Sequence, residues 1–178
     1  MKILWRILGG LLVIALFFLA KPTLTMWAYS GDGKFRVEGI PPLTNHRIEF
    51  GKIDLTQSGT YTFTFRGYSS HTYSLLVLAI PGVTDSQLAA SATCVRATIT
   101  SKNMASPVID HQECLRDQAR RNPQLADETR YVPLFLHGSY RNLQLSWWKR
   151  YELEIQVTDG DPNLSRLRTD VDLFSGWK

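Results

Sequence analysis

The chain has 178 residues, of which 44% are hydrophobic and 20% charged, a balance typical of a globular protein and not of a disordered one. The net charge of +4 arises mostly from Lys2, Arg6 and Lys21, because the chain beyond residue 28 carries 17 basic and 16 acidic residues. A nearly neutral domain lacks the basic surface that binds phosphate backbones, so no nucleic-acid partner is expected.

The N-terminal segment, residues 1–28, has the pattern of a membrane-targeting sequence. Lys2 and Arg6 precede an uncharged apolar run over residues 7–20. This order predicts that the N-terminus stays in the cytoplasm and that the rest of the chain is exported. We therefore expect a bacterial inner-membrane protein with a single pass and its C-terminal domain in the periplasm, or a periplasmic protein if the segment is cleaved.

Whether the segment is a retained signal-anchor or a cleaved signal peptide stays open. A helix over residues 7–20 reaches about 21 Å, short of a hydrocarbon core of roughly 30 Å, which favours a signal peptide. Apolar residues resume after Pro22, and Trp5 and Trp27 could sit at the membrane interfaces, which favours an anchor. A buried core helix is the third reading, against which the flanking charges argue.

After a polar link at residues 29–34, the domain over residues 35–178 shows period-two hydrophobicity, which indicates half-buried strands. Residues 73–80 form a continuous apolar run, typical of a strand covered on both faces. The predicted strands are residues 35–39, 46–54, 60–66, 73–80, 94–101, 130–137, 151–158 and 167–174. Strands in series with short turns predict a mainly β fold, an antiparallel β-sandwich that is immunoglobulin-like in outline, with one short helix.

The two cysteines, Cys94 and Cys114, are expected to form a disulfide outside the cytoplasm. Free buried thiols and a metal site are the alternatives, but a zinc site needs four ligands and only His111 lies close by in sequence. The one predicted helix runs from Pro107 or Asp110 to Arg121, with a charged face on the surface. The disulfide would then join the strand at 94–101 to this helical insertion.

No catalytic or metal motif stands out, so no enzyme activity, metal or cofactor is expected. The four histidines, at positions 46, 71, 111 and 137, have no metal-pair spacing. The acidic pairs Asp127–Glu128 and Asp170/Asp172 could supply carboxylates for acid–base chemistry, although solvated turns and strand edges account for them as well. Catalytic groups that converge from distant positions stay possible.

The most unusual local composition is the sequence Trp147-Trp148-Lys149-Arg150. Adjacent residues of a strand face opposite sides, so one of the two rings should point away from the core. Exposed Trp beside Arg is enriched at protein–protein interfaces, which makes these four residues a candidate partner-binding surface. The alternative is that one ring lies in the core and a loop covers the other.

Three stretches with a familiar order, residues 53–65, 131–136 and 151–157, resemble an uncharacterised family of exported bacterial β-sandwich domains, some associated with antibacterial toxins. The resemblance spans roughly residues 35–175 and brings no catalytic signature. It implies a membrane-held, periplasmic immunity protein that binds a toxin. The alternatives are a structural component of a secretion or pilus assembly, which the close-packing Gly9-Gly10 favours, and an envelope enzyme.

Overall fold

The computed structural model describes most of the chain beyond residue 27 and a few positions before it. The described residues are 9–10, 12–13, 16, 28–40, 43–68, 73–102, 104, 106–121, 129–135, 145–146, 148–164 and 169–176. Within these ranges, no helix is both long and apolar enough to cross a membrane.

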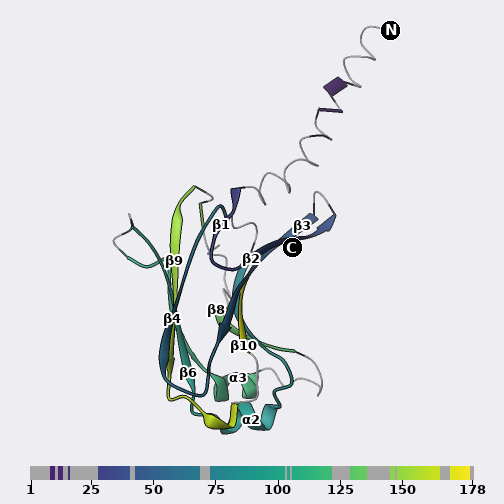
Figure 1. The fold of residues 1–178 in the computed structure, drawn as a ribbon. Coiled ribbons are helices and arrows are strands. Elements are labelled where there is room, and N and C mark those ends of the chain that lie inside the picture. Colours follow the sequence, from purple (N-terminus) through teal and green to yellow (C-terminus); the bar gives the residue numbers. More distant parts are fainter. Residues whose placement is uncertain are drawn as a thin grey trace.

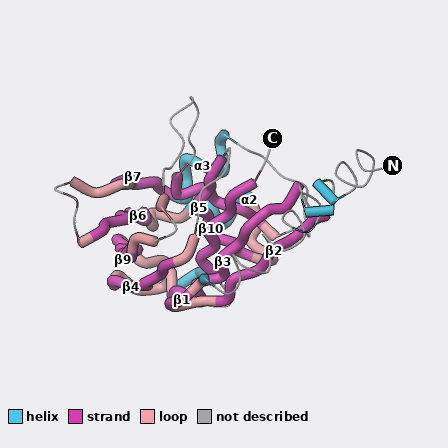
Figure 2. Tube along the Cα trace, turned by 90° about the horizontal axis from the view of Figure 1, so that it is seen from above, coloured by secondary structure: helices cyan, strands magenta, loops and turns pink. Residues whose placement is uncertain are grey.

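The domain is mainly β and consists of two antiparallel five-stranded sheets, packed face to face (Figure 1). Sheet A has the order β1 (Ser30–Gly31), β4 (Gly59–Arg66), β9 (Arg150–Thr158), β6 (Cys94–Ser101) and β7 (Ile109–Cys114). Sheet B has the order β2 (Lys34–Ile40), β3 (Leu43–Ile53), β10 (Thr169–Gly176), β5 (Tyr73–Ile80) and β8 (Arg130–Phe135). Figure 2 shows the two layers from above, with the helices α2 (Asp85–Ala90) and α3 (Leu115–Arg121) beside them. A short 3-10 helix, η1, spans Pro162–Leu164.

Side-chain alternation builds the core between the sheets. Along β9, the residues at odd positions from Tyr151 to Val157 are buried, and the intervening residues from Glu152 to Gln156 are exposed. One face of the strand therefore packs inward and the other meets solvent, as period two requires. The inner faces of sheet B supply matching apolar residues, such as Ile48, Leu78 and Leu173.

A β-bulge in β3 changes which residues face the core. Val171 of β10 pairs with Gly51, whereas the next residue, Asp172, pairs with Glu49, so one extra residue is accommodated in β3. Before the bulge Ile48 is buried, and after it the buried position is Ile53. A single inserted residue reverses the phase of the alternation, which allows one long strand to keep apolar residues inside at both of its ends.

The two ends of the sandwich differ in what they carry. We call the end where β4 stops and β9 starts the proximal end, because Ala28 lies there against Gly67: a Cβ on Gly67 would lie 2.2 Å from the Ala28 carbonyl oxygen. The opposite, distal end holds α2 and α3, which pack against each other (Figure 1). The polar link at 29–34 joins the sheets, since β1 pairs with β4 and β2 starts at Lys34.

The eight predicted strands are all present, with ends shifted by at most a few residues. The predicted helix from Pro107 or Asp110 to Arg121 is wrong in its first half, because residues 109–114 form β7 and only Leu115–Arg121 is helical. An edge strand meets another strand on one side only, so its polar composition resembles that of a surface helix. The sequence also missed α2 and the two-residue strand β1.

Candidate functional site

The outer face of sheet B carries an open cleft of about 430 Å³ that crosses all five strands. Six of its eleven lining residues are charged, and one is a large aromatic ring. The lining residues are Lys34, Arg36, Arg47, Glu49, Gly51, Ala79, Pro81, Thr129, Tyr131, Asp170 and Asp172. Three basic side chains thus balance three acidic ones.

Strand register brings the charged groups together. Glu49 lies between Lys34 of β2 and Asp172 of β10, and Arg47 pairs with Phe174 of β10. Arg47 Nη2 donates to Asp172 Oδ2 at 2.8 Å, and its Nε lies 3.5 Å from Glu49 Oε1. Arg36 Nη2 reaches Glu49 Oε2 at 3.1 Å, which extends the chain of ion pairs toward the sheet edge.

The acidic end of this network is buried. The Asp172 side chain is 0% exposed, and burial raises the pKa of this carboxyl above its usual range, with Glu49 and Asp170 acting in the same direction and Arg47 opposing them. The ion pair with Asp172 raises the pKa of Arg47 in spite of the burial of the guanidinium. Arg47 therefore stays charged and compensates a carboxylate that water does not reach.

Polar atoms at the floor of the cleft are left with unused bonding capacity. Asp172 Oδ1 and Arg47 Nε are buried and have no hydrogen-bond partner among the described residues, although Nε faces Glu49 Oε1 at 3.5 Å. A buried acceptor and donor without partners cost free energy, and such groups are uncommon in native proteins.

An aromatic wall flanks the charged groups. Tyr131 is 46% exposed and contacts Phe174 edge-on, with ring centroids 6.3 Å apart. The Arg47 guanidinium lies 4.9 Å from the centroid of the Phe174 ring, in a cation–π arrangement. The cleft therefore combines a fixed arginine, a tyrosine and buried charge, the composition of sites that anchor a protein partner.

The sequence-predicted carboxylates are only partly brought into this site. Asp170 and Asp172 both line the cleft, but the bond to Arg47 occupies one oxygen of Asp172. Asp127 and Glu128 lie outside the described residues. Among the residues that are described, no three His, Cys, Asp or Glu side chains are grouped closely enough to hold a metal ion.

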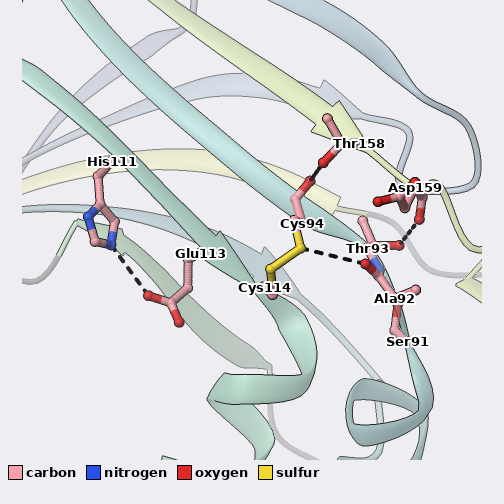
Figure 3. Close-up of a disulfide and its surroundings, with 9 residues drawn as sticks. All are labelled: Ser91, Ala92, Thr93, Cys94, His111, Glu113, Cys114, Thr158 and Asp159. Carbon is pink, nitrogen blue, oxygen red and sulfur yellow. Dashed lines mark hydrogen bonds and ion pairs between the residues drawn. A yellow bond between two sulfur atoms is a disulfide. The ribbon is translucent and has the colours of Figure 1, made fainter.

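The predicted disulfide between Cys94 and Cys114 is present on the outer face of sheet A (Figure 3). The two residues are direct partners across β6 and β7, and Cys94 also pairs with Thr158 of β9. The bridge therefore joins two strands, whereas the sequence placed Cys114 in a helix. Closing a loop of this length stabilises a fold by about 3 kcal/mol. The bond fixes the edge strand β7 just before α3 starts.

Trp148 lies in a turn and not in a strand. The Lys149 amide donates to the Ser146 carbonyl at 3.0 Å, and β9 starts only at Arg150. Trp148 is 60% exposed, as expected for one ring of the pair. Trp147 lies outside the described residues. The Tyr151 hydroxyl anchors the turn by accepting from the Ser146 amide at 2.8 Å.

Sequence reasoning missed most of the cleft. Arg36, Arg47 and Glu49 lie at alternate positions of predicted strands, where they looked like ordinary solvated residues. The only available signal was the density of charge on the outward positions of strands 35–39 and 46–54. Their convergence depends on the strand order of sheet B, which the sequence does not display.

The comparisons with known proteins leave the chain without an assigned family. The sequence matches no family model, and no curated protein is similar to it. In a search of solved structures, the chain is similar to a carbohydrate-binding module specific for non-crystalline cellulose, with 8% identity and a TM-score of 0.32. That alignment covers 83% of this chain and 87% of the other. A likeness this distant carries no functional argument.

Proposed function

We propose that this chain is a non-catalytic binding protein of the bacterial periplasm, held at the inner membrane by residues 1–28, and that it acts as an immunity protein that neutralises an antibacterial toxin. An N-terminal membrane helix and an immunoglobulin-like outline of the sandwich are parts of the same proposal. The disulfide supports an oxidising compartment.

The cleft on sheet B is the observation that carries the binding proposal. A polar surface with an exposed Tyr131, an arginine fixed by cation–π contact and buried charge offers the anchors that protein interfaces use. A neutralising protein needs a rigid scaffold and a complementary surface, and it needs no chemistry. The paired β-strands supply the scaffold, and the cleft supplies the surface.

The test is affinity purification of the full chain from solubilised membranes, followed by identification of the co-purifying protein. We expect a toxin, and we expect the Tyr131→Ala variant to recover it at least about tenfold less well, a loss typical of an interface anchor. Trp148→Ala is the matched control, because it removes another exposed ring from a different surface. Production of that toxin in the periplasm should kill cells that lack this chain.

Two other results would redirect the proposal. Loss of the partner in Trp148→Ala but not in Tyr131→Ala would place the binding surface at Trp147, Trp148, Lys149 and Arg150, as the sequence predicts. Recovery of secretion or pilus components in place of a toxin would favour the structural role in an envelope assembly.

A further inference from the structure

The proximal end of the sandwich carries a group of unpaired positive charges. Arg66 ends β4, Arg150 starts β9, Lys149 precedes it, and Lys102 follows β6. None of these four cations forms a salt bridge within the described part of the chain. Arg36, Arg47 and Arg96 on the sheet faces are, in contrast, all bound to carboxylates.

Arg66 and Arg150 are direct cross-strand partners, and both are exposed. Like charges directly opposite each other destabilise a pair of strands. The nearest acidic side chains are set back from this end: Glu38 and Glu152 lie two residues inside their strands, and Asp32 is bonded to Thr64. An external anion would relieve the repulsion between the two arginines.

The distal end carries charges of both signs. Its described turns and helices hold five aspartates and the three arginines of α3, and Arg130 starts β8 at the same end. The aspartates are Asp54, Asp85, Asp117, Asp159 and Asp161. The four cations of the proximal end thus lie at the end that receives the N-terminal segment, whereas the distal end mixes acidic and basic residues.

Apolar side chains accompany the proximal cations. Trp148 is 60% exposed and Met104 is 43% exposed, each in the connection next to one of the lysines. Ser101 and Tyr151 are cross-strand partners, which places the connections that hold Met104 and Trp148 side by side. Tryptophan with flanking Lys and Arg is the combination enriched at membrane–water interfaces.

The path of the chain brings this surface close to any membrane that holds residues 1–28. Ala28 contacts Gly67 next to Arg66, so no free spacer separates the N-terminal segment from the domain. Only residues 21–28 lie between the apolar run and this contact. Fully extended, they span at most about 27 Å, which limits how far the proximal end can stand from the bilayer.

We propose that the proximal end docks on anionic phospholipid headgroups, with Arg66, Lys102, Lys149 and Arg150 against the phosphates and Trp148 in the interfacial layer. This proposal rests on the membrane anchoring proposed above. In this orientation the bilayer contacts the proximal end and covers neither sheet face. The cleft on sheet B therefore stays open to a periplasmic partner. The turn that holds Trp148 then contacts lipid and not a protein partner.

The experiment uses the full chain in phospholipid vesicles, with an environment-sensitive fluorophore on Met104→Cys or on Ser58→Cys. Ser58 lies in the exposed turn between β3 and β4 at the distal end and is the matched control. Cys94 and Cys114 are not labelled, because they are joined. Spin-labelled headgroups should quench the fluorophore at 104 much more than that at 58, and more in anionic than in zwitterionic vesicles.

Charge-neutralised variants test the chemistry of the contact. Lys149→Gln with Arg150→Gln should lower the docked-to-free ratio about 25-fold, since each basic residue near an anionic surface contributes about fivefold. Arg116→Gln on α3 is the control and should change nothing. Equal quenching at 104 and 58, or equal quenching in both lipids, overturns the proposal.

Flotation separates this inference from the anchoring on which it rests. A chain that floats with vesicles but leaves the fluorophore at 104 in water is anchored without docking. A chain that does not float at all refutes the anchoring and the docking together. Shielding at 104 that appears only when the co-purified protein is added would show that the surface binds protein, which also overturns the lipid proposal.

Discussion

At the scale of single residues, Arg47 and Asp172 form an ion pair whose carboxylate is buried. Two charges lie on the outer face of a sheet where water does not reach the carboxylate, and their attraction offsets the cost of desolvation. Removing one partner leaves the other charge buried, whereas removing both leaves a neutral site. The pair can therefore be tested by a double-mutant cycle.

We expect Arg47→Met to lower the free energy of unfolding at pH 7 by about 3 kcal/mol, because it leaves Asp172 charged and buried. The second substitution, Asp172→Asn, should restore most of that loss. Urea unfolding of the two single variants and the double variant measures both effects. A double variant as unstable as Arg47→Met would show that the arginine acts through packing and not through its charge.

Asp172 makes the stability of the fold depend on pH, and it favours the folded state at low pH. The pKa of Asp172 is raised in the folded state, so protonated Asp172 favours folding. Its contribution to stability is complete below the ordinary pKa of an aspartate and is lost as the pH rises through the raised value. The deficit of Arg47→Met should therefore shrink as the pH is lowered from 7 toward 4, and Asp172→Asn should abolish that change.

At the scale of elements, Gly67 is the point where the N-terminal segment joins the sandwich. Its φ of +84° lies in the region that favours glycine, and the backbone of Ala28 fills the space that a Cβ would need. Tyr29 continues the attachment, because its ring stacks on Phe35 at 5.1 Å and its hydroxyl donates to the Asp32 carbonyl. Burial raises the pKa of Tyr29 to about 12, with Asp32 adding to the effect, so this hydroxyl stays protonated.

Gly67→Ala and Gly82→Ala separate backbone strain from contact with Ala28. Both glycines have a positive φ, but nothing lies within 4 Å of a Cβ at Gly82. We expect Gly82→Ala to cost about 1 kcal/mol, the strain alone, and Gly67→Ala to cost at least twice as much. Thermal unfolding measures both. Equal losses would mean that the contact between Ala28 and Gly67 is not rigid.

At the scale of the whole molecule, the N-terminus and the proximal end of the sandwich should lie on opposite sides of the membrane. Lys2 and Arg6 should keep the N-terminus in the cytoplasm and place everything after residue 28 outside. A reporter active only outside the cytoplasm, fused after Lys178, should be active. Replacing Lys2 and Arg6 by Glu should reduce that activity, and an active cytoplasmic reporter on the unaltered chain would contradict the topology.

The sequence by itself determined eight of the ten described strands and the disulfide. Alternation is a local property: residues 151–158 read as apolar and polar in turn because one face packs inward, and the same holds for 60–66. A chain with two cysteines leaves one partner for each, so their pairing did not require the fold. The exposure of one ring of the tryptophan pair was also anticipated, although not that it is Trp148 or that Trp148 lies in a turn.

Only the tertiary structure decided the cleft, the identity of β7 and the grouping of four cations at the proximal end. Arg47 and Asp172 are separated by 125 residues, and they meet because β3 and β10 are neighbours in sheet B. Residues 109–114 form a strand because β6 offers a partner at the sheet edge, which outweighs the helix-like composition of the segment. Such properties depend on which strands pair, and pairing joins residues that no local pattern connects.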